Sequence, residues 1–345
     1  MDLQEPFEAL ALRSQDSYVQ AVEAYCDGIL RLHWNERLIN KIFGRALQSH
    51  AAGRLVVQHY QWQLRGAPRP TLALLQRRMP GSARTLVTFF AVLRLAGMVA
   101  VDNDPADRRV RYLVPTPRLL DGLRTWVRHH LHCAEALGAL APGHARRLDN
   151  DADYFAAFLA GADHILDRLA ETRGRFGGWD WFDQRDGGGR IAMLLLREHC
   201  RACRPADAAP PQFALRASEI ALRLGFSHSH VRNLVNEASA LGHLTQDAPR
   251  GLVALTPRFQ ADIEAWLRQL LGWFTETATI AHQQLQSSSR PHARCEATHV
   301  PQPLQACAPA TPRTPPSTTS HARRQSDPRT AFLHGGVQRR QGAPD

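Results

Sequence analysis

Three stretches of the chain group histidine, cysteine or acidic side chains in a way that could bind a metal or transfer protons. The motif His-Cys-x-x-Cys at 199–203 has the spacing of half a zinc site, but a structural zinc ion takes four ligands and no second Cys/His pair follows at a suitable spacing. The run 129–133 lies in a helical pattern and is interpreted as a solvated face. The same interpretation holds for the acids Asp151, Asp153 and Asp163. With no phosphate loop, serine elbow or paired acid motif in the sequence, we expect no enzyme, no metal and no cofactor.

A different chemistry, hydrogen bonding to the edges of bases, is open to polar side chains on two short predicted helices. The first runs from Ser82 through Arg94, and its outward face carries arginine and threonine, which suit guanine and the thymine methyl group. The second follows Ser227, its expected cap. The residues of these helices that we predict to contact DNA are Ser82, Arg84, Thr85, Thr88, Ser227, His228, His230, Arg232 and Asn233.

The second of these helices belongs to a helix-turn-helix pattern. Residues 218–224 are predicted to form a short helix, and the next helix follows after a brief turn. Four positions carry the residue types that such a unit needs, a small residue, a turn glycine and two inward apolar residues: Ala221, Gly225, Val231 and Leu234. The earlier stretch 71–94 departs from this pattern, because Pro80-Gly81 occupies its turn.

A duplication with an offset near 140 residues organises the chain. Residues 27–30 recur as 163–166, 53–55 as 189–191, and 116–118 as 256–258. Each copy predicts the same series: a long helix, a second helix, two short helices, a strand-turn-strand and a long amphipathic helix. The long helices are expected at 17–32 and 118–137 in the first copy and at 154–171 and 258–280 in the second.

We therefore predict a mainly α fold with small β-wings, made of tandem winged helix-turn-helix modules joined by long helices. Module 1 with its flanking helices covers 1–145, module 2 covers 146–283, and a disordered tail covers 284–345. The tail is rich in Pro, Ser and Thr, and holds eight arginines. Two interpretations of it stay open: a basic arm that adds nonspecific DNA affinity, or an extension without such a role.

The first copy carries the clearer wing. Strands are predicted at 97–101 and 110–114, joined by the polar connection 102–109. In that connection Asp107-Arg108-Arg109, followed by Pro115-Thr116 and a long helix, resembles the MarR family of bacterial regulators. That family has an Asp-x-Arg wing, a Leu-Thr strand end and a long helix. The resemblance implies that Asp107 anchors the wing and that Arg109 enters the minor groove, where negative potential is concentrated.

The second copy keeps this motif only in part. Asp247 again precedes a Leu-Thr pair, but Pro249 stands where the arginine would be and Arg250 comes one place late. The wing residues that complete the predicted DNA-contacting set are Asp107, Arg108, Arg109, Arg111 and Arg250.

The charge of the chain supports a polyanionic partner, since the formal net charge is +10. Residues 65–128 hold 12 arginines against four acids, whereas residues 201–268 hold eight against six. The first module is therefore expected to supply most of the affinity that comes from counterion release. No secretory signal and no apolar run of membrane-spanning length are visible, so we expect a cytoplasmic chain without a membrane partner.

These features predict a transcriptional regulator that binds double-stranded DNA. We expect the four long helices to pack into an internal pseudo-dimer, so that two recognition helices address major grooves about 34 Å apart. The chain would act as a monomeric pseudo-dimer or a homodimer, and the family resemblance allows a small-molecule effector, for which the sequence indicates no residues. Two alternatives remain open: a plasmid-type replication initiator with tandem winged helices, and a winged-helix module that binds protein without DNA.

Overall fold

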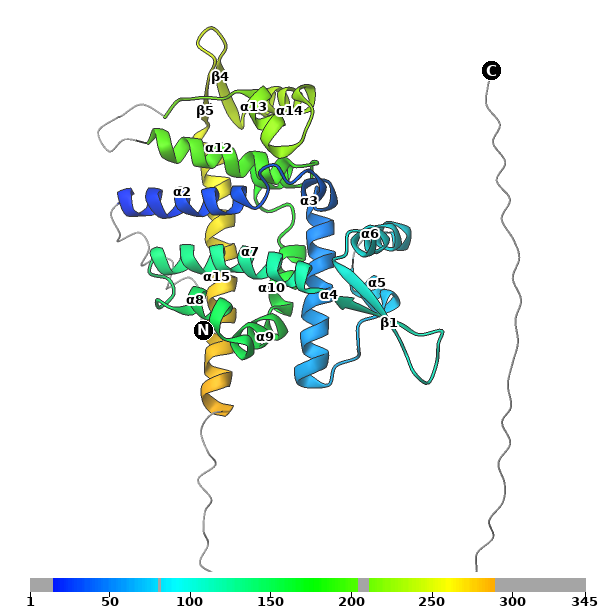
Figure 1. The fold of residues 1–345 in the computed structure, drawn as a ribbon. Helices are drawn as coiled ribbons and strands as arrows, with labels where there is room; N and C mark the ends of the chain where they lie inside the picture. The colour runs from blue at the N-terminus through cyan, green and yellow to red at the C-terminus, as the bar shows by residue number, and fades with distance from the viewer. Residues whose placement is uncertain (1–14, 80–81, 204–210, 289–345) are drawn as a thin grey trace, which may run out of the picture. The chain divides into compact units, whose positions relative to one another are not determined.

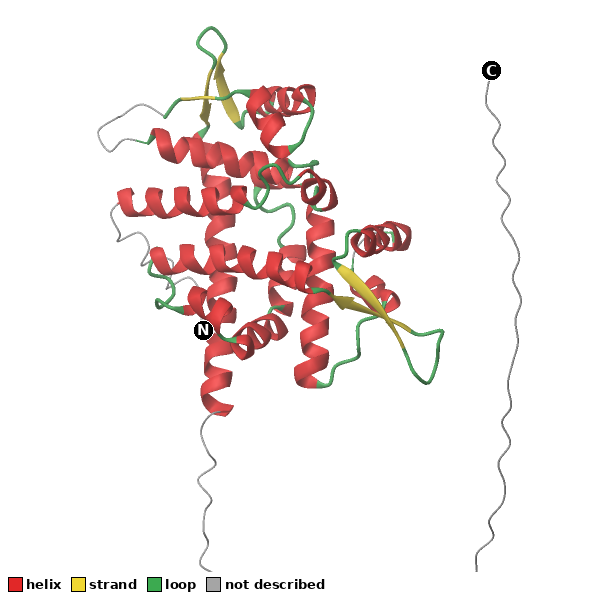
Figure 2. Cartoon of the chain, in the orientation of Figure 1, coloured by secondary structure: helices red, strands yellow, loops and turns green. Residues whose placement is uncertain are grey.

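Helices and two small antiparallel sheets make up the described part of the chain (Figures 1 and 2). The structure is a computed structural model, and it describes residues 15–79, 82–203 and 211–288. These residues lie within one compact unit. The expectation of a mainly helical chain with small sheets is confirmed. Within the described residues, the helices are too short or too polar to cross a membrane.

The first series of elements begins with α4 (Ala46–Arg65) and ends with α7 (Pro117–Ala136). Between them lie α5 (Leu72–Arg78), α6 (Ala83–Leu95), β1 (Val99–Asn103) and β2 (Arg111–Pro115). The two strands form an antiparallel pair. An isolated bridge joins Thr71 to Tyr112 of β2, so the segment before α5 runs beside β2.

The second series repeats this order. Its elements are α12 (Gly188–Ala202), β3 (Phe213–Ala214), α13 (Ala217–Leu224), α14 (His228–Ala240), β4 (Leu244–Asp247), β5 (Leu252–Leu255) and α15 (Pro257–Ser288). The sheet has the order β3-β5-β4 with antiparallel pairing. The short strand β3 therefore takes the place that the isolated bridge has in the first series.

The residues at their ends explain where the two short helices of each series, α5 and α6 or α13 and α14, begin and end. At three helix starts a hydroxyl accepts a hydrogen bond from the backbone N–H three residues on, as expected of N-caps: Thr71, Ser82 and Ser227. Gly225 ends α13 at a φ of 73°, which is the left-handed turn that the sequence predicts. The turn at Pro80-Gly81 lies outside the described residues.

The long flanking helices match two of the four predicted ranges closely. The helices α2 (Gln15–Arg31) and α7 agree with the predictions, but a single helix over 154–171 is wrong. The chain there forms α9 (Ala152–Gly161) and α10 (Asp163–Glu171), separated at Ala162. Nδ1 of His164 bonds to the Gly161 carbonyl (2.9 Å), which gives a terminal carbonyl of α9 a partner.

The last helix is longer than predicted. It continues past Ile280 to Ser288, because Ala281 is buried and Leu285 packs against the hydrophobic core. The predicted start of the disordered tail at residue 284 is therefore wrong for 284–288, and the rest of the tail lies outside the described residues.

Three short helices complete the part of the fold that the structure describes: α3 (Arg37–Ile42), α8 (His144–Asn150) and α11 (Gly177–Asp183). The boundary expected between residues 145 and 146 falls inside α8.

The two copies exchange their leading helices. The helix α2, which precedes the first series, packs against α12 of the second, and α9, which precedes the second series, packs against α4 of the first. Ion pairs follow the same exchange. Asp27 of α2 meets Arg197 of α12 (3.1 Å), and Asp163 of α10 meets Arg54 of α4 (2.6 Å). Since Asp27 and Asp163 are matching positions of the duplication, the exchange is reciprocal.

Both hydrophobic clusters consequently contain residues from both copies. One combines α4 and α6 with α9 and the second half of α15, and the other combines α2 with α12, α14 and the first half of α15. Between them α7 packs against α2 and α15. At that junction His130 of α7 stacks on Phe274 of α15, with ring centroids 4.4 Å apart, and hydrogen bonds with the Tyr25 hydroxyl of α2 (2.9 Å). The interpretation of the run 129–133 as a solvated face is therefore wrong, because His130, Leu131 and Cys133 are buried.

Candidate nucleic-acid interface

Helix α14 has one apolar and one polar face. Val231, Leu234, Val235 and Ala238 are buried. The outward side carries the predicted residues His228, Arg232 and Asn233, all exposed. Asn236 is exposed as well. It was not among the residues predicted from the sequence, although it lies four residues after Arg232 and three after Asn233 and so shares their side of the helix. An arginine beside two asparagines can form the paired hydrogen bonds that distinguish guanine and adenine in a major groove.

His230 differs from the other predicted residues of α14. Its side chain is half-buried, and Nε2 bonds to the backbone carbonyl of Asp186 (2.9 Å). The ring also lies 5.3 Å from that of Phe226. His230 therefore ties α14 to the segment before α12, and the polar face for a ligand consists of its neighbours.

The first two turns of α6 carry the predicted polar residues of the first copy. Ser82, Arg84, Thr85 and Thr88 are all exposed. The hydroxyls of Ser82 and Thr85 bond to each other (2.8 Å) while Ser82 caps the helix. Arg84 forms no ion pair with a described residue, so its guanidinium is available to an outside acceptor.

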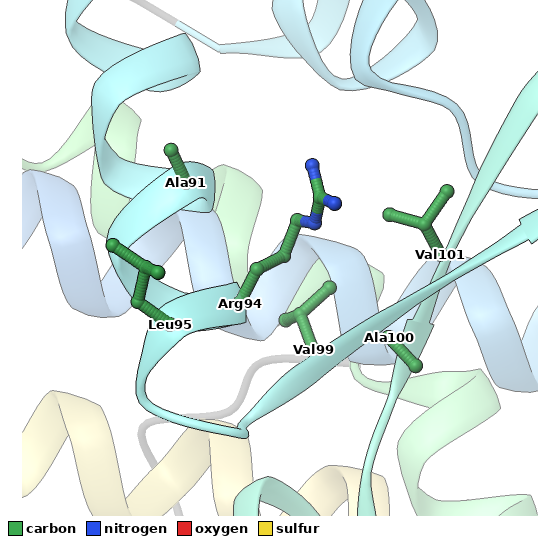
Figure 3. A pocket seen from close by; sticks show the side chains of 6 residues that line it. All are labelled: Ala91, Arg94, Leu95, Val99, Ala100 and Val101. Carbon is green, nitrogen blue, oxygen red and sulfur yellow. The ribbon is translucent and has the colours of Figure 1, made fainter. Parts of the chain in front are cut away.

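Besides these polar residues, α6 exposes three large apolar side chains together with Arg94. They are Val87, Val92 and Leu95, with Leu95 at 89%. Residues of α6 and β1 line a shallow pocket that is open to solvent. Arg94 of α6 extends across it toward Val99 and Val101 of β1 (Figure 3). Recognition helices contact bases mainly through their N-terminal residues. Base contacts by α6 would therefore come from its polar beginning, and the apolar end would lie beyond them.

In the wing between β1 and β2, the most connected acid is Asp104. Its carboxylate accepts hydrogen bonds from the backbone N–H groups of Ala106 (2.8 Å) and Asp107 (3.1 Å) and from the Tyr112 hydroxyl (2.5 Å). The Tyr112 hydroxyl and these N–H groups lower the pKa of the Asp104 carboxyl below its usual value. Asp107, which the family resemblance names as the anchor, accepts from the N–H of Arg109 (2.9 Å). Both acids thus shape the turn.

The base of the wing is braced by Arg69. Its guanidinium lies over the rings of Tyr112 (4.4 Å) and Trp62 (4.7 Å), and it pairs with Asp102 of β1 (2.5 Å). The arginines of the wing itself are exposed to solvent. Arg108, Arg109 and Arg111 are exposed, and no described residue pairs with any of them. A rigid loop with three free guanidinium groups is suited to a phosphate backbone or a narrow groove.

The wing of the second copy is a four-residue turn between β4 and β5. Asp247 accepts from the N–H of Arg250 (3.3 Å), and the Arg250 guanidinium lies 3.5 Å from the same carboxylate. The side chain of Arg250 is still 75% exposed. This wing offers one arginine that is partly neutralised by its own aspartate, so it contributes less charge than the first.

The cysteines do not form a reactive or metal-binding centre in the described residues. Cys26, Cys133 and Cys200 are buried free thiols, and burial raises the pKa of Cys200 to about 12. A thiol becomes a good ligand or nucleophile only as the thiolate. Across the described residues, no three His, Cys, Asp or Glu side chains gather so as to hold a metal ion.

Comparison of the chain with family models, with curated proteins and with solved structures gave no match.

Proposed function

We propose that the chain is a transcriptional regulator that binds double-stranded DNA through two tandem winged helix-turn-helix units. The observation that carries the proposal is the outward face of α14. Arg232, Asn233 and Asn236 stand exposed on a helix that is capped by Ser227 and set at a fixed turn by Gly225. Hydrogen-bonding side chains on a rigid helix are what direct reading of a major groove requires.

The order of elements supports the winged-helix assignment. Each series has a helix, a strand or bridge, two short helices, a two-stranded hairpin and a long helix. The reciprocal packing of α2 on α12 and of α9 on α4 supports an internal pseudo-dimer, in which one chain provides what two MarR-like protomers would provide. A small-molecule effector belongs to this proposal through the family resemblance alone, and we assign no residues to it.

The two units would have different roles in binding DNA. The first has the longer wing with three unpaired arginines, so it would supply much of the salt-dependent affinity for phosphates. The second has the helix with the polar outward face, so it would supply most of the base discrimination. The first part of this division keeps the expectation from the charge distribution, that the first module supplies most of the affinity from counterion release.

Selection of duplexes from a random pool, followed by gel-shift titration at several salt concentrations, tests the proposal. We expect Arg232→Ala to weaken binding to the selected duplex by about 1–3 kcal/mol, because a paired hydrogen bond to one base is lost, while binding to random duplex is unchanged. Arg146→Ala on α8 removes an exposed arginine away from α14 and serves as the control. Absence of salt-dependent binding to any duplex would contradict the proposal.

A second candidate, a module that binds protein, is favoured by the exposed apolar end of α6. If Arg232→Ala leaves duplex binding unchanged while Leu95→Glu abolishes capture of a partner, this second function stands instead. A replication initiator would be recognised in the same selection by recovery of directly repeated sites beside an origin.

A further inference from the structure

The segment around α3 is attached to the turn between α13 and α14. The backbone N–H of Asn35 and the side-chain amide of Asn40 donate hydrogen bonds to the last two carbonyls of α13 (2.8 and 3.0 Å). Arg37 lies directly against Gly225, because a methyl group added to that glycine would come within 2.9 Å of the Arg37 Cγ atom. This part of the first copy therefore touches the point from which α14 starts.

The same segment is also attached to α6 of the first copy. Helix α3 packs against α6, and the rings of Phe43 and Phe89 meet edge to face at 6.1 Å. Buried Arg190 of α12 donates to the carbonyls of Asn40 (3.0 Å) and Phe43 (2.9 Å), which fixes the backbone between the two attachments. Helix α3 is thus a rigid bridge between α6 and the α13–α14 turn, as its position in Figure 1 also shows.

Two cations project from this bridge. Arg37 and Lys41, the only lysine of the chain, are four residues apart and so share one side of α3. Both are exposed, and neither pairs with an acid among the residues that the structure describes. The neighbouring acids are Glu36, which is exposed, and Asp186, whose carboxylate lies against Gly44. They reduce the local positive charge, but neither neutralises the two cations by contact.

We propose that Arg37 and Lys41 bind the phosphate backbone of DNA between the two half-sites read by α6 and α14. This inference rests on the proposed function. Two neighbouring major grooves on one face of a duplex are separated by a minor groove whose edges are phosphates. Cations held between two recognition helices meet those phosphates, and their fixed position lowers the ordering entropy that the contact costs.

In the second copy the helix before α12 is α11, which packs against α12 and α15. It carries the acids Asp180 and Asp183, and the Asp180 carboxylate accepts a hydrogen bond from the N–H of Phe176 (2.5 Å). The exposed cations of this stretch, Arg173 and Arg175, lie before α11 rather than on it, so the proposal concerns the α3 pair alone.

The test compares two double variants of the full chain that remove equal charge. One is Arg37→Gln with Lys41→Gln, and the control is Arg146→Gln with Arg268→Gln, two exposed arginines without described acid partners. The Kd for a selected duplex and a random duplex is measured over a salt series. We expect the α3 pair to reduce the slope of log Kd against log salt by about 2, equally for both duplexes, because two phosphate contacts are lost. Sequence preference stays unchanged, and the control pair keeps the slope of the unmodified chain.

Hydroxyl-radical footprinting adds a positional readout, since protection at the centre of the site is expected to disappear with the α3 pair alone. If the unmodified chain binds and the α3 pair keeps its slope and central protection, the inference is overturned and the proposed function stands. A slope lowered equally by the control pair also overturns it, because general charge then explains the effect. If the unmodified chain binds no duplex, the proposed function and this inference fall together.

Discussion

His130 lies where α7 of the first copy packs against α15 of the second, and its protonation state follows from its hydrogen-bond partners. Nδ1 lies 2.8 Å from the Trp126 carbonyl, which can only accept, so Nδ1 carries the proton. Nε2 then accepts from the Tyr25 hydroxyl, and the neutral ring stacks on Phe274. Burial lowers the pKa of His130 to about 3, so the folded chain keeps this imidazole neutral through the range in which an unfolded histidine titrates.

This neutral histidine predicts a specific loss of stability in mild acid. A histidine whose folded pKa is depressed contributes stability above its unfolded pKa of about 6.5, and that contribution is lost as the pH falls toward the folded value. Between pH 6.5 and 5.5 the loss is about 1 kcal/mol for one such group. We expect His130→Gln to be less stable than the unmodified chain at pH 7.5, and the difference to shrink by about 1 kcal/mol from pH 6.5 to 5.5.

Urea unfolding of both chains at each pH measures this difference. Other groups titrate in the same range: burial lowers the pKa of His33 and His50 to about 4 and raises that of Asp183 to about 6. They are common to both chains and cancel in the comparison. A difference that stays constant with pH would show that His130 is protonated alike in the folded and unfolded states.

At the scale of single elements, the sequence predicted those features that depend on neighbouring residues. The caps at Ser82 and Ser227 and the turn at Gly225 follow from side-chain and backbone chemistry within four residues, and the structure has them. Apolar periodicity does not predict the break at Ala162, but Gly161, a poor helix former at the end of α9, is a local signal for it. Asn236 could have been found from its spacing to Arg232.

Partners distant in sequence could not be predicted. Arg54 and Arg190 are matching positions of the duplication, yet Arg54 pairs with Asp163 and Asp167 whereas Arg190 donates to the carbonyls of Asn40 and Phe43. Local patterns give the same expectation for both. The difference arises because α10 carries acids toward α4 while the chain before α4 presents its backbone to α12.

The contact between Gly225 and Arg37 predicts how substitutions in the turn between α13 and α14 change the stability of the chain. Gly225 and Gly242 have nearly equal φ angles of 73° and 75°. An added methyl group would meet Arg37 at Gly225, whereas at Gly242 it has no atom within 4 Å. We expect Gly242→Ala to lower the free energy of unfolding by about 1–2 kcal/mol through backbone strain alone, and Gly225→Ala to cost more.

Chemical denaturation of both variants provides the measurement, with Gly242→Ala as the matched control. The excess cost at Gly225 reports how firmly α3 is held against the turn. Equal costs for the two substitutions would mean that Arg37 moves aside freely, which would contradict the rigid bridge on which the phosphate contact depends.

For the whole molecule, the exchange of α2 and α9 means that neither half of the described chain contains a complete core. Leu55 of α4 belongs to a cluster whose other members include Phe155 of α9 and Phe274 of α15, and Ile29 of α2 lies in a cluster with Leu195 of α12. The duplication in the sequence suggests two independent modules. The packing instead joins them through shared clusters, because each copy buries apolar surface against a helix supplied by the other.

This exchange predicts how the chain behaves when it is cut in the loop that precedes α8. Residues 1–140 and 141–345 are produced separately and together, and their folding is followed by circular dichroism and urea unfolding. Each fragment alone exposes the surface that its partner's leading helix covers, so we expect poor helicity and no cooperative transition from either. Produced together, the fragments copurify in a 1:1 ratio and unfold cooperatively. A cooperative transition from either fragment alone contradicts the shared core, and analytical ultracentrifugation of the uncut chain, expected to be monomeric, tests whether the exchange is completed within one molecule.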